Sequence, residues 1–151
     1  MRLDFDAAAH KYSLVDDDTG ETKEIPSATQ ILSGLGLVDF SRFTQADMQR
    51  GTDRHLATEL WDRGSLDEGS LDDNTRPALE AWRKFLDDSG FKESDIEVRV
   101  SSLSKRYAGT VDRVGSIDGK RTMIDIKGSS EMPTYALQLW LYKIAWEEMH
   151  E

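Results

Sequence analysis

Cysteine is absent from this chain of 151 residues, which excludes disulfides, thiolate metal sites and iron–sulfur clusters. No apolar run is long enough to span a bilayer, and the opening MRLDFD does not have the pattern of a signal peptide. We therefore expect no membrane partner, and the cytoplasm is the default location.

Basic residues are scarce as well. The 19 lysines and arginines face 29 aspartates and glutamates, which gives a formal net charge of −10. A general polyanion binder usually has a basic surface, so the overall charge argues against one and leaves room only for a local basic groove. The acids cluster in DDDTGETKE, LDEGSLDD and LDDSGFKESD, which we interpret as solvated turns and helix ends.

The first part of the chain, residues 1–90, predicts a hairpin followed by helices. Residues 5–27 alternate in the manner of a β-hairpin that turns at DDDTGE. SATQ is a capping box that starts a short helix after Ser27. Further helices are predicted over 44–63 and 75–90, the last with proline in its first turn and glycine at its end.

The second part, residues 91–151, predicts strands and one helix. Apolar and polar residues alternate from Asp95, and two more strand-like runs follow, YAGTVDRVGSI and KRTMIDIKG. A helix opens at Pro133. Length and composition fit one globular domain over 1–151 with its own core. The fold class is mixed α/β (α+β).

Asp118 and Gly119 connect the two runs as a two-residue type I′ hairpin. This turn fixes the register of the two strands. It places three cross-strand pairs opposite one another, namely Ile117 with Lys120, Ser116 with Arg121 and Val114 with Met123.

Continuing this register places Asp112 opposite Asp125, with Lys127 on the same face. Opposed residues have Cβ atoms about 4.5–5.5 Å apart, so two carboxylates repel unless a proton or a cation lies between them. Mg²⁺ and Mn²⁺ prefer such oxygen ligands, and Lys127 would then hold a water or a phosphate oxygen beside the metal. The alternative is a partly exposed sheet face on which Lys127 neutralises Asp125.

Three segments in this order, GTVDRV, MIDIKG and YALQLWLY, resemble the PD-(D/E)XK nuclease superfamily, and more narrowly its RecB-like and phage-exonuclease branch. That branch carries Gly-x-x-Asp on one strand and Asp/Glu-x-Lys on the next. A helix with a glutamine follows, often with a tyrosine one turn later. The residues of this chain that match are Asp112, Asp125, Lys127, Gln138 and Tyr142.

Two upstream features extend the resemblance. RGTDRH is similar to the histidine motif of the branch and makes His55 a candidate metal ligand, and Glu97 is similar to the acid of its first motif. The opening FDAAAHKYSLVDDD and the following IPSATQIL look like the N-terminal segment of phage-encoded members. The resemblance thus covers nearly the whole chain.

The resemblance implies a restriction-endonuclease-like core, in which helices flank a central mixed sheet with an antiparallel hairpin. It implies phosphodiester hydrolysis with one or two Mg²⁺ or Mn²⁺ ions. The implied metal ligands are His55, Asp112, Asp125 and the backbone carbonyl of Ile126. Lys127 would orient the attacking water, and Glu97 would hold a second metal or a metal-bound water.

Substrate contacts are expected from two groups of residues. The resemblance assigns Gln138 and Tyr142, which share a helix face at i, i+4. Basic residues that flank the motif segments are candidates for phosphate contacts, namely Arg50, Arg54, Lys105 and Arg106.

The leading hypothesis is a metal-dependent DNA nuclease, more an exonuclease than an endonuclease, for phage replication, recombination or DNA processing. It would act in the host cytoplasm if phage-encoded. One alternative is a non-catalytic binding or assembly subunit on the same fold, as a homo-oligomer or with a partner subunit. A second is a metalloenzyme for a small phosphate ester. The sequence leaves open the polarity, the strandedness and the choice of DNA or RNA.

Overall fold

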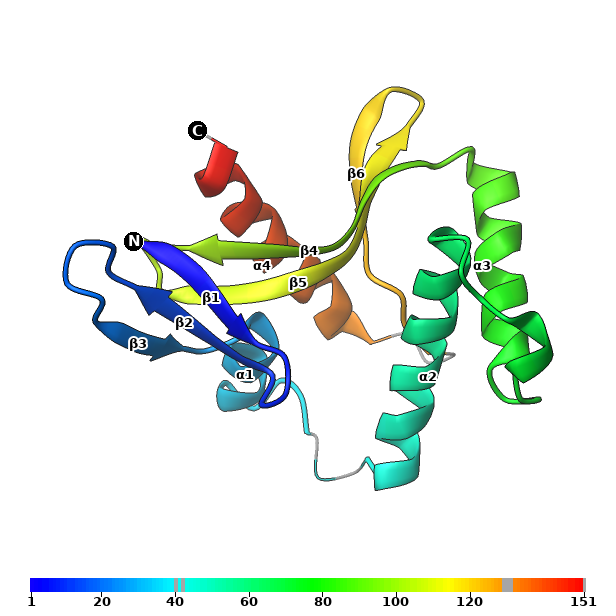
Figure 1. Ribbon diagram of the computed structural model, residues 1–151, viewed down its shortest axis with the longest axis horizontal. Helices are drawn as coiled ribbons and strands as arrows, with labels where there is room; N and C mark the ends of the chain where they lie inside the picture. The colour runs from blue at the N-terminus through cyan, green and yellow to red at the C-terminus, as the bar shows by residue number, and fades with distance from the viewer. Residues whose placement is uncertain (40, 42, 129–131, 151) are drawn as a thin grey trace. The chain divides into compact units, whose positions relative to one another are not determined.

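The computed structural model describes residues 1–39, 41, 43–128 and 132–150. Within them it has four α-helices and two three-stranded antiparallel sheets, with strand orders β1-β2-β3 and β4-β5-β6 (Figure 1). The mixed α+β class is confirmed, and the restriction-endonuclease-like core stays a prediction. Among the described residues, none of the helices combines the length and the apolar content that crossing a membrane would need.

The chain forms two compact units, each assembled from separate segments. Unit 1 contains residues 1–39, 97–111 and 132–151, and unit 2 contains residues 40–96 and 112–131. Two long strands, β4 (Lys92–Ser102) and β5 (Tyr107–Ile117), begin in one unit and continue in the other. The expected single domain over 1–151 stays a prediction.

The first sheet of unit 1 is a meander of three short strands, β1 (Arg2–Asp6), β2 (Lys11–Val15) and β3 (Thr22–Ile25). Alternate residues of β2 point to the core, so Tyr12 and Leu14 are buried together with Ile25 and Ala108. The predicted hairpin is confirmed as the β2–β3 pair, and β1 adds a strand to it.

Two helices complete unit 1. The predicted capping box starts α1 (Ala28–Gly34), because the Ser27 hydroxyl accepts the backbone N–H of Gln30 at 3.1 Å. The last helix, α4 (Pro133–His150), begins at its proline as expected. A Cβ at Gly109 of β5 would lie 2.3 Å from a ring carbon of Tyr142, so this close contact of α4 requires glycine.

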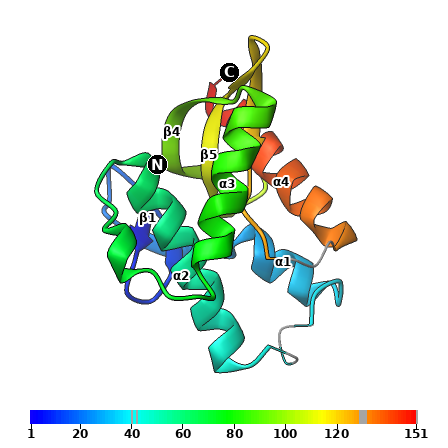
Figure 2. The same cartoon turned by 90° about the vertical axis from the view of Figure 1, so that its right-hand side faces the viewer.

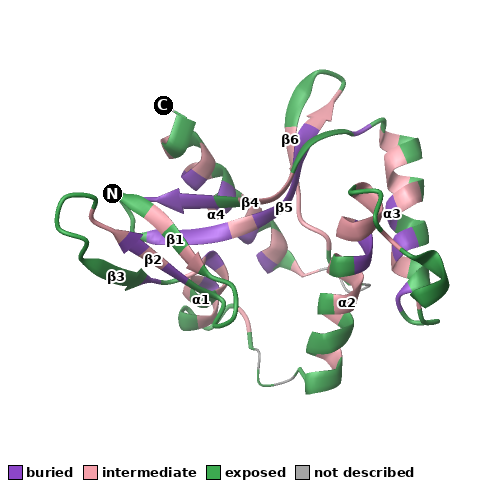
Figure 3. Cartoon of the chain, viewed as in Figure 1, coloured by how far each residue is buried: buried purple, intermediate pink, exposed green. Residues whose placement is uncertain are grey.

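Unit 2 contains α2 (Gln45–Asp62), a short 3₁₀-helix η2 (Glu68–Ser70) and α3 (Arg76–Ser89). α2 and α3 lie side by side (Figures 1 and 2). The predicted end of α3 is confirmed, because Gly90 caps it with a left-handed φ of 63°. Figure 3 shows that the first turns of α2 are exposed, whereas its later turns are partly buried.

The hairpin of β5 and β6 (Lys120–Ile124) also belongs to unit 2 from Asp112 onward. Asp118 and Gly119 have φ values of 50° and 75°, as a type I′ turn requires. The three predicted cross-strand pairs are present, and the ladder extends to Arg113 opposite Ile124.

The expected continuation of the ladder to Asp112 and Asp125 is wrong, because β6 ends at Ile124. The backbone N–H of Ile126 donates instead to the carboxylate of Asp112 at 2.5 Å. The Asp112 side chain thus accepts the backbone hydrogen bond of residue 126 that a neighbouring strand would accept in a continued ladder.

Gly51 lies in the interior of α2, and apart from its chain neighbours and the backbone of its own helix, no atom of a described residue lies within 4 Å of where its Cβ would be. A glycine inside a helix costs about 1 kcal/mol relative to alanine. We expect Gly51→Ala to raise the free energy of unfolding by about 1 kcal/mol, measured by urea denaturation. An unchanged or lowered midpoint would contradict the open space at this position.

Candidate functional site

Three predicted metal-site residues of unit 2 lie close together, namely His55, Ile126 and Asp112, and the Asp112 carboxylate contacts the other two. Asp112 is 6% exposed. Its Oδ2 accepts the N–H of Ile126 at 2.5 Å and lies 3.3 Å from Nδ1 of His55 on α2. The structure therefore brings His55, Asp112 and Ile126 together, even though the strand register ends earlier, and their role as metal ligands stays a prediction.

The environment of His55 favours its protonated form. Burial alone would lower the pKa of this imidazole, but the hydrogen bond to Asp112 and the negative charges of Asp112 and Asp125 together outweigh burial and the charge of Lys127. The pKa of His55 is therefore raised above its ordinary value. A cation at Asp112 would replace this attraction and select the neutral, ligating imidazole.

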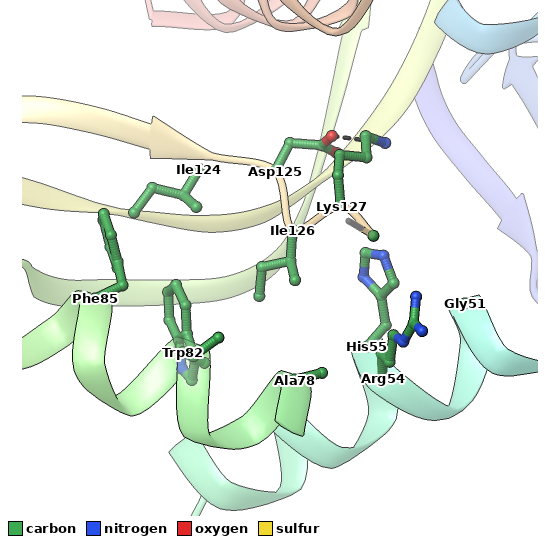
Figure 4. A pocket seen from close by; sticks show the side chains of 12 residues that line it. Gly51, Arg54, His55, Ala78, Trp82, Phe85, Ile124, Asp125, Ile126 and Lys127 are labelled. Atoms are coloured by element: carbon green, nitrogen blue, oxygen red, sulfur yellow. Dashed lines mark ion pairs between the residues drawn. The ribbon is translucent and has the colours of Figure 1, made fainter. Parts of the chain in front are cut away.

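Asp125 and Lys127 form an ion pair directly after β6, with Nζ of Lys127 2.6 Å from Oδ2 of Asp125 (Figure 4). The Asp125 side chain is only 4% exposed. Its burial raises the pKa of this carboxyl above the ordinary value, and the negative charge of Asp112 raises it further, against the opposing charge of Lys127. The two acids are thus close enough to repel.

The pair of buried carboxylates is the feature that most clearly fits a cation. Oδ2 of Asp125 is buried and already contacts the ammonium of Lys127 at 2.6 Å. The negative charge of Asp112 nevertheless still raises the pKa of Asp125. Imidazole nitrogen and carboxylate oxygens together form a donor set that suits Mn²⁺, and the oxygens suit Mg²⁺. The residues present therefore fit the implied metal.

A cavity of about 340 Å³ in unit 2 adjoins these residues. Figure 4 shows that Ile124 and Ile126 point toward α3, whereas Asp125 and Lys127 point to the other side of their segment. The cavity is lined by α2 at Gly51, Arg54 and His55, by α3 at Ala78, Ala81, Trp82 and Phe85, and by residues 124–128.

The two arginines predicted on α2 have different surroundings. Arg50 is exposed and forms an ion pair with Asp47 one turn earlier. Arg54 is partly buried and lines the cavity. No hydrogen bond or ion pair from Arg54 to another described residue is present. Arg54 thus contributes to the cavity lining a positive charge that no described residue neutralises by an ion pair.

The other predicted substrate residues belong to unit 1. Gln138 and Tyr142 of α4 are both buried, and the side-chain amide of Gln138 donates to the Tyr142 hydroxyl at 2.7 Å. The same amide lies 3.4 Å from the Thr29 hydroxyl of α1. Lys105 and Arg106 are exposed before β5. Unit 1 thus joins Gln138 to Tyr142, and the substrate roles of these residues stay predictions.

Glu97 belongs to unit 1 and has an unusual backbone. Its φ is 53° inside the strand β4, a left-handed conformation that residues other than glycine rarely adopt. Such conformations cost about 1–3 kcal/mol and concentrate at functional sites. The predicted role of Glu97 at the site is consistent with this strain and stays a prediction.

Sequence reasoning missed a buried polar network behind the site. The Arg113 side chain is fully buried, and its Nε lies 2.6 Å from Oδ2 of Asp62 and 3.3 Å from Glu93. The indole of Trp82 donates to the other oxygen of Asp62 at 2.9 Å. Burial, and next the charge of Asp62, raises the pKa of Glu93, while Arg113 opposes this shift.

This network connects α2 to β5 inside unit 2. Asp62 lies seven residues after His55, two helical turns along α2 and hence on the same face. Arg113 follows Asp112 on β5 and also donates to the Asp112 carbonyl at 2.8 Å. The only sequence signals were the i, i+7 spacing of His55 and Asp62 and an arginine within the apolar run around Val114.

No protein-family model, curated protein or solved structure matches this chain.

We expect Asp62→Ala to lower the free energy of unfolding by about 3–5 kcal/mol, because it leaves the buried Arg113 charge without its main partner. The double variant Asp62→Leu with Arg113→Met is expected to recover most of this loss, since it removes both charges. Chemical denaturation measures both. A double variant no more stable than Asp62→Ala would contradict a paired network.

Substitutions at Glu97 test the backbone strain, because a left-handed φ reverses the usual order of stability of alanine and glycine in a strand. In an ordinary strand, glycine is less stable than alanine by roughly 0.5–1 kcal/mol. A left-handed φ costs alanine about 1–2 kcal/mol and costs glycine nothing. We therefore expect Glu97→Gly to unfold at a higher temperature than Glu97→Ala in a calorimetric scan. The ordinary order would show that residue 97 is not left-handed in solution.

Proposed function

We propose that this chain is a Mg²⁺- or Mn²⁺-dependent DNA nuclease with a restriction-endonuclease-like core of the PD-(D/E)XK type. One observation carries the proposal. In unit 2 the buried acids Asp112 and Asp125 lie close enough to repel each other, with His55 3.3 Å from Asp112 and Lys127 2.6 Å from Asp125. A chain tolerates such an arrangement most readily when a cation is its resident ligand.

The bound cation would supply electrostatic stabilisation of the charge that develops on the scissile phosphate. Its proposed ligands are His55, Asp112, Asp125 and the carbonyl of Ile126. Within the chain, Asp112 orients two of these groups, because its Oδ2 binds the N–H of Ile126 and faces the imidazole of His55.

Lys127 is the residue best suited to handle the attacking water. Its ammonium is held 2.6 Å from Asp125 and its side chain is still 28% exposed, so it can donate a hydrogen bond to a water while Asp125 fixes its position. We assign Lys127 the role of orienting that water beside the phosphate. Glu97 is proposed to hold a second ion or a water.

DNA is the proposed substrate, and exonucleolytic attack is favoured over endonucleolytic attack. Arg54 supports contact with a phosphate, because its charge is available at the cavity. Arg50, Arg106, Gln138 and Tyr142 are proposed as further contacts. Phage replication, recombination or DNA processing is the proposed setting.

An assembly role has one observation in its favour. Leu137 and Trp140 on α4 are 42% and 59% exposed, and exposed apolar side chains on one helix often mark a partner surface. A homo-oligomer or a partner subunit at this helix is compatible with a nuclease. A scaffold without catalysis would instead show no turnover and no metal site.

The test uses linear and circular DNA labelled at either end, incubated with Mn²⁺, with Mg²⁺ or with chelator. We expect metal-dependent loss of linear DNA. Lys127→Ala and Asp125→Asn should each lower the rate by about 10²–10³-fold, the loss typical of removing one preorganised electrostatic group.

The matched controls are Lys84→Ala and Asp88→Asn on α3, since these two residues form an exposed ion pair of the same chemistry at 2.7 Å. Both controls should cleave at the wild-type rate. Calorimetric titration with Mn²⁺ separates catalysis from a scaffold role, because binding should disappear in Asp112→Ala. No cleavage and no Mn²⁺ site in the wild-type chain would refute the proposal.

A further inference from the structure

The cavity in unit 2 has two chemically different parts. One part is an apolar wall, made by Ile124 and Ile126 on one side and by Ala78, Trp82 and Phe85 of α3 on the other (Figure 4). The other part is a basic rim with Arg54, His55 and Lys127. A ligand that fits both parts must have a flat or apolar body and a negative group beside it.

The aromatic side chains of the wall, Trp82 and Phe85, are held in place by contacts with each other and with neighbouring residues. The rings of Trp82 and Phe85 are stacked with centroids 5.4 Å apart and planes 16° apart. The Trp82 indole donates to Asp62 at 2.9 Å, and the Arg113 guanidinium lies 5.5 Å from its ring centre. A wall whose side chains are already fixed loses little conformational entropy when a ligand binds.

Six of the eleven described lysines and arginines of unit 2 form ion pairs with acids, namely Arg50, Arg63, Arg83, Lys84, Arg113 and Lys127. Arg54 forms no ion pair with an acid among the described residues, and it is the arginine that lines the cavity. Gly128 lies close to this guanidinium, because a Cβ built there would lie 3.0 Å from its Nη1.

We propose that this cavity binds one unpaired nucleobase, with the adjoining phosphate at Arg54, so that the substrate is single-stranded or frayed at the site. The inference rests on the proposed nuclease function and specifies its substrate class. Enzymes that act on nucleic acids place unstacked bases against aromatic and apolar side chains. A volume of about 340 Å³ is at the lower end of ligand pockets and suits one base.

The probe is a fluorescein-labelled single-stranded 12-mer, compared by anisotropy with the same strand carrying abasic sites and with its blunt duplex. Metal-free buffer with chelator prevents cleavage. We expect the intact strand to bind at least fivefold more tightly than the abasic strand and than the duplex, because stacking on the wall needs a free base.

Ala78→Leu narrows the cavity without removing a polar group, and the ratio of intact to abasic affinity should fall to about one. Phe85→Leu is the second test if Ala78→Leu proves unstable. It removes an aromatic ring, and leucine is well tolerated in a helix, so the ratio of intact to abasic affinity should fall as well. Ala46→Leu, exposed in the first turn of α2, is the matched control and should retain the full ratio.

Equal affinity for intact and abasic strands would overturn the inference. So would an Ala78→Leu variant that melts at a higher temperature with unchanged affinities, since the cavity would then be only an unfilled part of the core. If the protein cleaves DNA with Mn²⁺ but binds intact and abasic strands equally, only the base-binding inference is contradicted. If it binds the intact strand more tightly but does not cleave DNA, the nuclease proposal is contradicted and the base-binding inference stands.

Discussion

The buried ion pair between Arg113 and Asp62 determines the arrangement of unit 2. A guanidinium without solvent contact is tolerated only when acids and carbonyls surround it, so α2 and β5 must meet at these two residues. Asp112 precedes Arg113 and points to the opposite side of the strand. His55 lies two turns before Asp62 on the same helical face. The pairing of Arg113 with Asp62 therefore also sets the distance between Asp112 and His55.

Asp125, the second acid of the site, is positioned by a hydrogen bond of the neighbouring residue Ile126. β6 ends before Asp125, and the chain is then held by the hydrogen bond from Ile126 to the Asp112 carboxylate. Side chains continue to alternate after the strand ends, so apolar Ile124 and Ile126 face α3 while Asp125 and Lys127 face away (Figure 4). The segment thus places apolar side chains against α3 and polar ones toward the candidate metal site, while Asp125 and Lys127 also line part of the cavity.

Sequence reasoning succeeded wherever the signal was local. The capping box at Ser27, the turn at Asp118 and Gly119 and the glycine after α3 each act within a few residues, and each was predicted at its place. It failed where distant residues decide. The end of β6 depends on a carboxylate fourteen residues away, and the pairing of Arg113 with Asp62 spans 51 residues. The convergence of His55 with Asp112 was expected only through resemblance, since no periodicity joins α2 to β5.

The two units are interleaved along the chain, which crosses from one to the other after residues 39, 96, 111 and 131. No single cut can release either unit as a continuous fragment. During synthesis, unit 2 cannot be completed before residue 131 leaves the ribosome, and unit 1 must wait for the last helix. The nascent chain therefore has no early folding intermediate that contains a whole unit, and its assembly depends on contacts of long sequence separation, which form slowly.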